Sequence, residues 1–183
     1  MYAAGVLPLS WVDTGQGPRA MFLVGKDARD DSWSDFAGKF EKCDRDIAST
    51  AAREFWEETY GVLMDARVMR ARLVAGACIP LKGRTQNCHP YYCYVTEVPF
   101  LLHLRSAFAK HLAFLRYRNT QRVYVEKTDI VYVTLEELFS EEFPKRGVFR
   151  ETLLHNRDRL ERVAAAGPRG WAGECAAAAP DIF

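Results

Sequence analysis

Three glutamates, Glu54, Glu57 and Glu58, stand within the short run Arg-Glu-Phe-Trp-Glu-Glu. At about 100° per residue in an α-helix, their side chains fall within one arc of roughly 100°. Phe55 and Trp56 join several alanines on the adjoining side, which forms a core-facing stripe. The run therefore predicts an amphipathic helix that packs by one face and presents three carboxylates on the next.

Carboxylates this close together repel one another, by a few tenths of a kcal/mol for an i,i+4 pair in water. A divalent cation reverses the sign of that interaction, because hard ions such as Mg²⁺ take oxygen ligands and bind carboxylates together with substrate phosphates. Most charge runs are solvated helix faces. The acidic run alone therefore leaves a metal site and a solvated face as alternatives.

The residues around the run distinguish these alternatives. Gly38-Lys39-Phe40-Glu41 precedes the helix in a turn-rich segment, and Thr59-Tyr60-Gly61 follows it. A glycine loop, a linker, an alanine-containing helix, Arg-Glu-x-x-Glu-Glu and a terminal glycine, in this order, resemble the signature box of the Nudix hydrolases. The matching residues are Gly38, Arg53, Glu54, Phe55, Glu57, Glu58, Gly61 and Val62.

The box departs from the family pattern at three points. Asp44 stands where the pattern has its first glutamate, counted from Gly38, but the spacing to Arg53 is one residue longer than in the pattern. Asp46 therefore competes with Asp44 for this role. Tyr60 is an extra residue before the terminal glycine. These insertions lie in a loop and at a helix end, where changes in length are tolerated, so the acidic face is retained.

The resemblance implies a metal-dependent reaction, the hydrolysis of a pyrophosphate linkage in a nucleoside diphosphate derivative. Mg²⁺ or Mn²⁺ would neutralise the phosphates and activate water. The implied metal ligands are Glu54, Glu57, Glu58 and the backbone carbonyl of Gly38, and any of the three glutamates is a candidate for the base that acts on metal-bound water.

Two further residues are predicted to assist the reaction. Arg53 lies off the acidic arc by roughly 100°, so we expect it to pair with Asp44 or Asp46 and orient the glutamates. Glu126 precedes the predicted strand 130–133, where many Nudix enzymes carry a glutamate that serves as base or extra ligand. The alternative for Glu126 is an exposed loop carboxylate.

Substrate contacts are predicted at three residues near the box. Lys39 is a candidate phosphate contact, with a solvated lysine as the alternative. Trp33 and Phe36 are candidates for stacking on a base, which contributes roughly 1–3 kcal/mol per base, with core packing as the alternative. A basic set further along is a candidate site for RNA or inositol phosphates, or a solvated helix face, and consists of Arg105, Lys110, Arg116, Arg118 and Arg122.

The substrate itself stays open between a phosphorylated small molecule and capped RNA. Free nucleotides or nucleotide sugars, the 5′ cap of mRNA and diphosphoinositol polyphosphates all suit such a site. The two insertions and the changed first carboxylate also keep open a Nudix module that binds a nucleotide without cleaving it.

Composition agrees with a globular protein. The 183 residues predict a single domain over residues 1–166 followed by a loosely ordered tail, 167–183. The net charge of +1 excludes a global basic field for nucleic acid, and five scattered cysteines form no zinc or disulfide pattern. No apolar stretch approaches the ~18 residues of a membrane span, and no signal peptide is present, which favours a cytoplasmic or nuclear protein. Nothing in the sequence indicates an oligomeric state.

Strand and helix patterns alternate along the chain and predict an α/β fold around a mixed sheet. The Nudix resemblance implies an α/β/α sandwich with an inserted helix before a late strand. Segment 64–81 is apolar but is not divided between strand and irregular structure by its pattern. The expected strands are 2–12, 20–24, 91–95 and 130–133, and the expected helices are 47–60, 101–118, a short helix after Thr134 and 148–165.

Overall fold

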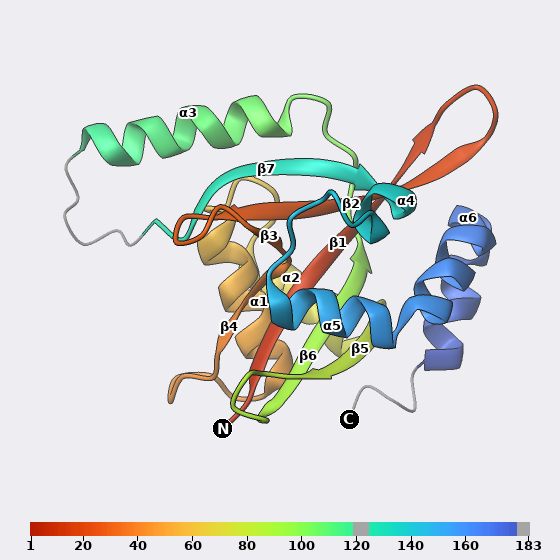
Figure 1. The fold of residues 1–183 in the computed structure, drawn as a ribbon, viewed down its shortest axis with the longest axis horizontal. Coiled ribbons are helices and arrows are strands. Elements are labelled where there is room, and N and C mark those ends of the chain that lie inside the picture. Colours follow the sequence, from red (N-terminus) through yellow and green to blue (C-terminus); the bar gives the residue numbers. More distant parts are fainter. Residues whose placement is uncertain (119–124, 179–183) are drawn as a thin grey trace.

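In the described part of the chain, seven strands form one mixed sheet at the centre of the molecule (Figure 1). The computed structural model describes residues 1–118 and 125–178. The first strand, β1, pairs with β4 and β2 along one edge, both antiparallel, and with β6 along the other edge, in parallel. The strands are β1 (Ala3–Asp13), β2 (Pro18–Asp27), β3 (Trp33–Ser34), β4 (Phe36–Lys39), β5 (Ile79–Arg84), β6 (Pro90–Glu97) and β7 (Lys127–Thr134).

Helices cover both faces of this sheet (Figure 1). One face packs against α1 (Ile47–Glu58), α2 (Ala66–Val74) and α3 (Leu104–Tyr117). The other face packs against α4 (Leu135–Phe139), α5 (Gly147–His155) and α6 (Arg157–Ala178). The predicted α/β/α sandwich is therefore confirmed, including the inserted helix α3 before the late strand β7.

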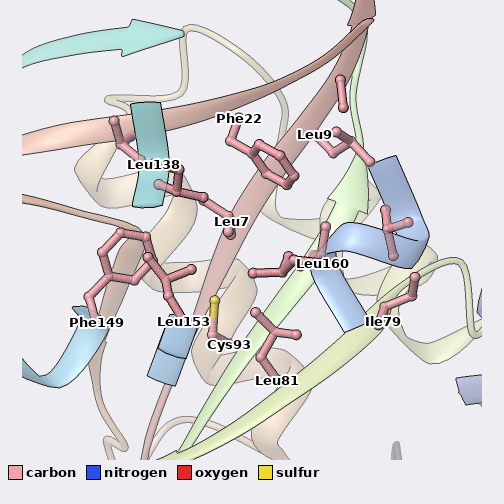
Figure 2. Close-up of a cluster of buried hydrophobic side chains, with 14 of the residues drawn as sticks. Leu7, Leu9, Phe22, Ile79, Leu81, Cys93, Leu138, Phe149, Leu153 and Leu160 are labelled. Atoms are coloured by element: carbon pink, nitrogen blue, oxygen red, sulfur yellow. The ribbon is translucent and has the colours of Figure 1, made fainter. Parts of the chain in front are cut away.

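Strand β1 shows why the sheet is covered on both sides. Side chains alternate between the two faces of a strand, so Val6 enters the core under α1, whereas Leu7 and Leu9 enter the core under α5 and α6. Figure 2 shows this second core, in which leucines of the strands meet Phe149, Leu153 and other side chains of the helices. A strand buried on both faces reads as a nearly continuous apolar run, as β1 does from Ala3 to Leu9.

The structure divides one segment that the sequence left open and corrects one expected helix. The undivided segment 64–81 contains helix α2, whose N-cap Asp65 accepts a hydrogen bond from the Arg67 amide at 2.8 Å, and the first half of strand β5. The single helix expected over 148–165 is two helices, α5 and α6, which meet at Asn156. The Asn156 amide group donates to the Lys82 carbonyl at 3.1 Å, which ties this break to β5.

The expected loose tail is also wrong for residues 167–178. Helix α6 continues through a kink at Gly167, where φ is 66°, and buries Trp171, Cys175 and Ala178 against the sheet. Residues 179–183 lie outside the described part of the chain, and the division into one domain stays a prediction. Within the described part, no helix is both long and apolar enough to cross a membrane.

Candidate active site

The loop before α1 contains the two aspartates that compete for Arg53. Asp46 is the N-cap of α1: its side chain accepts from the Ser49 amide at 2.7 Å and lies 2.5 Å from the Arg70 guanidinium. Asp44 receives Arg53 in a bidentate pair, with Nε and Nη2 each 3.0 Å from a carboxylate oxygen. Of the two loop aspartates, Asp44 is therefore the one that pairs with Arg53.

Arg53 also holds the acidic face of α1. Its Nη1 donates to Glu54 at 2.8 Å and to Glu57 at 2.9 Å, and its Nη2 donates to the Lys39 carbonyl at 2.9 Å. One guanidinium therefore connects the loop carboxylate, two glutamates of the helix and strand β4. These are the contacts that the predicted orienting role of Arg53 requires.

Gly38 lies directly against the carboxylate of Glu54. A Cβ at this position of β4 would come within 2.2 Å of Glu54 Cδ, so only glycine allows the contact. Burial raises the pKa of Glu54 to about 7, the guanidinium of Arg53 opposes this shift, and the negative charges of Glu57 and Glu126 add to it. Glu54 is thus a carboxylate whose charge is only partly compensated by its surroundings.

Glu58 points into the protein and is 3% exposed. One carboxylate oxygen accepts from the Ala37 amide at 2.9 Å, and the other lies 3.7 Å from the ammonium of Lys127. Burial raises the pKa of Glu58 well above its usual range, and the charge of Lys127 opposes the shift. Both oxygens of this glutamate therefore have partners inside the fold.

Glu57 and Glu126 complete the acidic group. The Glu57 side chain is 48% exposed and is held by Arg53 alone among its recorded partners. Glu126 is partly buried beside the start of β7, and its carbonyl accepts from the Ala28 amide at 2.8 Å. Its negative charge raises the pKa values of both Glu54 and Glu58, so the fold brings Glu126 near the acidic face of α1, and its role stays a prediction.

The carboxylates on and near α1 are the type of ligand that a hard divalent cation takes. Their present spacing in the described part of the chain, however, does not form a metal site. Within the described residues, no three histidine, cysteine, aspartate or glutamate side chains are already placed to hold a metal ion. Carboxylate oxygens are nevertheless present at Glu54, Glu57 and Glu126, and hard oxygen ligands of this kind are what Mg²⁺ requires. A cation bound there would replace the hydrogen bonds that Arg53 makes to the first two.

A pocket of about 310 Å³ adjoins the acidic face across Gly38. It lies between β4, the β5–β6 hairpin and the start of α5, and its volume is at the lower end of the range for small-molecule sites. Its lining includes the cations Arg29, Lys39 and Arg146. The pocket therefore has three cations in its lining and borders strand β4, whose Gly38 contacts Glu54.

The predicted substrate contacts are only partly brought together. The exposed Lys39 lines the pocket, whereas the Trp33 ring stacks on Phe143 with the ring centres 5.8 Å apart. Phe36 is fully buried and packs edge-on against Phe55 of α1, so the prediction that it stacks on a base is wrong. Its side chain instead packs β4 against α1.

Other residues of the site were not foreseen from the sequence. Asp35 is buried at the pocket wall and accepts a hydrogen bond from the Tyr91 hydroxyl. Burial raises the pKa of Asp35, against the opposing effect of this hydrogen bond. Arg146 arrives from the start of α5 and lies 3.7 Å from Asp27. None of these residues belongs to a motif, because strands and helices far apart in sequence assemble this wall.

A scan against protein-family models found no match, and a search of curated proteins found none either. Solved structures do match. The Nudix domain of Shewanella oneidensis NrtR in complex with ADP-ribose is 12% identical with a TM-score of 0.54, and covers 88% of each chain. A C. elegans Ap4A hydrolase binary complex is 11% identical with a TM-score of 0.53, over 87% of this chain and 98% of that one. A MutT/Nudix family protein from Listeria innocua is 13% identical with a TM-score of 0.54, over 88% and 94%.

These similarities extend over nearly all of the chain and include the layered sheet on which α1 lies. At such low sequence identity they establish architecture. The chain has the Nudix fold.

Proposed function

We propose that this protein hydrolyses a pyrophosphate linkage in a nucleoside diphosphate derivative with the help of Mg²⁺ or Mn²⁺. The observation that supports this most is the acidic face held by Arg53 next to a cation-lined pocket, with only Gly38 between them. Two of the structural relatives are a domain bound to ADP-ribose and an Ap4A hydrolase, and both ligands contain such a linkage.

We assign separate roles in this reaction to the residues of the site. Glu54, Glu57 and the carbonyl of Gly38 would hold the cation, which supplies charge neutralisation and an acidified water when bound. Arg29, Lys39 and Arg146 bind the phosphates that the pocket receives. Glu126 accepts the proton of the attacking water. Positioning and charge stabilisation account for most of the rate in phosphoryl transfer, so no covalent intermediate is required.

Replacement of Glu57 tests the proposal directly. Glu57→Gln removes one charge from a half-exposed side chain, so we expect loss of turnover by about two orders of magnitude with an unchanged melting temperature. The assay is Mn²⁺-dependent hydrolysis of ADP-ribose, dinucleoside polyphosphates, nucleotide sugars and inositol pyrophosphates. Glu142→Gln, in an exposed loop, is the matched control. Near-wild-type hydrolysis by Glu57→Gln would exclude the metal site.

Helix α3 favours capped RNA as a second candidate substrate. Residues 101–118 contain four lysines and arginines and no acidic residue. The outer face of α3 exposes Phe114 and Tyr117, which are 52% and 86% exposed, beside Lys110 and Arg118. Alternating cations and aromatic rings bind the backbone and bases of single strands. Arg105 does not contribute, because it pairs with Asp129 at 2.9 Å.

Decapping makes a separate prediction. Reversing the charge at Lys110, Arg116 and Arg118 should weaken hydrolysis of capped RNA and flatten its salt dependence, because fewer phosphates are neutralised. Hydrolysis of small nucleotides should stay unchanged. If the wild-type protein releases no cap nucleotide from RNA, this candidate is excluded.

A module that binds a nucleotide without cleaving it is the remaining candidate. It is supported by the hydrogen bonds of Arg53, which occupy Glu54 and Glu57, and by the absence of a ready-made metal cluster among residues 1–118 and 125–178. Calorimetry with ADP-ribose and Mn²⁺, followed by chromatography of the recovered ligand, separates the two. A binder returns intact ligand, whereas an enzyme returns two monophosphates.

A further inference from the structure

Lys127 is a completely buried lysine next to the acidic face. Its ammonium lies 2.6 Å from the Ser34 hydroxyl, 3.2 Å from Asp27 and 3.7 Å from Glu58. Burial of an ammonium is unfavourable unless charged and polar partners surround it, as they do here. The three contacts come from three separate segments, β2, β3 and α1. The roles assigned above to the acidic face make no use of this cation.

A break in the strand pairing aims Lys127 at α1. Strands β2 and β7 pair regularly until Asp27 lies opposite Lys127, where the register shifts and Thr128 is the extra residue. With regular alternation, Lys127 would share the sheet face of Val131 and Val133, which pack under the C-terminal helices. The bulge moves it to the opposite face, since a shift of one residue reverses the side-chain direction.

The strand beneath Lys127 is shaped to receive it. A Cβ on Gly25 of β2 would lie 2.8 Å from Lys127 Cδ and 3.0 Å from the Phe36 ring, so the lysine stem occupies space that any other residue would fill. At its other end, the Lys127 carbonyl accepts from the Tyr60 hydroxyl at 2.8 Å. The residue is thus fixed by its stem, its ammonium and its backbone.

Glu58 is the member of the acidic face that Lys127 neutralises. Asp27 has a second cation, Arg146, at 3.7 Å, whereas Lys127 is the only cation recorded within ion-pair distance of Glu58 in the described residues. The remaining oxygen of Glu58 binds the Ala37 amide next to Gly38. A divalent ion ligated by Glu58 would therefore lie close to a fixed ammonium, and the two positive charges would repel. Arg53 opposes a cation at Glu54 and Glu57 in the same way, so burial makes the difference. The Glu57 side chain is 48% exposed, whereas those of Glu58 and Lys127 are 3% and 0% exposed.

We propose that Lys127 is the permanent counter-cation of Glu58, which removes this glutamate from the metal ligands and leaves a site for one divalent ion on Glu54 and Glu57. Glu58 then acts as a positioning residue that holds β4 through Ala37. This inference rests on the proposed metal-dependent function, but it concerns the number of ions and their ligands rather than the reaction.

Titration of the full chain with Mn²⁺, followed by electron paramagnetic resonance of free Mn²⁺, tests the inference without any turnover. We expect one bound ion per wild-type chain. Glu57→Gln should weaken binding by about tenfold or more, whereas Glu58→Gln should change it by less than about threefold. Two or more ions on the wild type, or an equal loss of affinity in the two variants, would overturn the inference.

Lys127→Met provides a second test, in which the number of bound Mn²⁺ ions is expected to increase. Releasing Glu58 from its counter-cation should allow additional Mn²⁺ to bind, and the double variant with Glu58→Gln should return to one ion. Lys26→Met is the control, because this partly exposed lysine pairs with Asp31 outside the buried cluster. If Lys127→Met does not fold, the wild-type stoichiometry and the two glutamate variants still decide.

The outcomes also separate this inference from the proposed function. Absence of Mn²⁺ binding overturns both. One bound ion that depends on Glu57 and not on Glu58, without hydrolysis of any tested substrate, supports the role of Lys127 and contradicts the enzyme.

Discussion

Arg53 shows how one side chain organises a site at the scale of single residues. Its planar guanidinium has several N–H donors in a fixed arrangement, and it uses them on Asp44, Glu54, Glu57 and the Lys39 carbonyl. A lysine would satisfy only part of this set, because it presents a point charge without a fork. The arrangement depends on the identity of Asp44 as its anionic partner.

Replacing each of the two loop aspartates with asparagine distinguishes their roles. Asp44→Asn removes the charge that receives Arg53 in a bidentate pair, so we expect kcat/KM for the best substrate to fall by about 10- to 100-fold. Asp46→Asn keeps an N-cap that is as good as aspartate, and turnover should change less than threefold. Steady-state kinetics check both variants. An equal loss in both would mean that Asp44 has no orienting role.

Glu54 makes stability depend on pH. Its pKa is raised from 4.5 to about 7 by burial, so the native state binds more protons than the unfolded state between these values. The free energy of unfolding therefore falls as pH rises from about 4.5 to about 7. Glutamine at this position carries no charge to bury, so Glu54→Gln should not lose stability as pH rises. At pH 8 the free energy of unfolding of the variant should exceed that of wild type by on the order of 2 kcal/mol, and at pH 4 the two should be equal.

Urea denaturation without divalent ions at the two pH values measures this difference, with Glu142→Gln as an exposed control. A variant that is no more stable than wild type at pH 8 would show that Arg53 compensates Glu54 fully. A salt-bridged aspartate makes the free energy of unfolding rise with pH, whereas Glu54 makes it fall. The reason is that desolvation raises the pKa of Glu54 by more than the attraction to Arg53 lowers it.

At the scale of elements, local signals predicted several helices and strands correctly. The capping box expected at Thr134 is present, with the Glu137 amide donating to the threonine at 3.2 Å and the Thr134 amide donating to the glutamate at 2.7 Å. Its two contacts are short in sequence, so the pattern alone determines them. Strand β1 and helix α1 were recognised for the same reason.

The second part of helix α6, residues 167–178, was missed because its local signals oppose a helix. Gly167 and Pro168 interrupt the run, and the alanines after them carry little apolar surface. A weaker signal was available, since Trp171, Cys175 and Ala178 follow the helical spacing of four and three residues. These side chains form the face that packs on the sheet, and tertiary packing outweighs local preference.

Trp171→Ala tests whether this part of α6 belongs to the fold. The side chain is 7% exposed, so truncation should lower the free energy of unfolding by about 3–5 kcal/mol. Arg169→Ala, which lies on the exposed side of the same helix, should change it by less than about 0.5 kcal/mol. Chemical denaturation measures both, and similar small effects would mean that residues 167–178 do not contribute to the core.

At the scale of the whole molecule, the sheet separates two cores that must form together. Val6 and Leu7 are neighbours in β1, yet they lie in different cores. Neither core is complete without the shared strands, so we expect one cooperative unfolding transition. The cysteines are distributed so that they report on this behaviour.

Thiol labelling should divide the five cysteines into two classes. Cys43 and Cys88 are exposed and should react rapidly in the native protein. Cys78 lies in one core and Cys93 and Cys175 in the other, and burial raises the pKa values of all three, so they should react only on unfolding. Mass spectrometry across a urea gradient checks this. Earlier labelling of Cys78 alone would show that the two cores unfold separately.

The sequence alone was sufficient for α1, its acidic face and the α/β class. These features depend on spacing over three or four residues, and helix geometry converts that spacing into one face. The tertiary structure decided which aspartate pairs with Arg53, that Phe36 is buried, and that Arg146 and Tyr91 meet in one pocket. It also turned Lys127 toward Glu58 through a bulge between two strands about a hundred residues apart. Strand register and the packing of helices on the sheet bring together segments that are distant in sequence. A local sequence pattern does not specify which distant residues will be in contact.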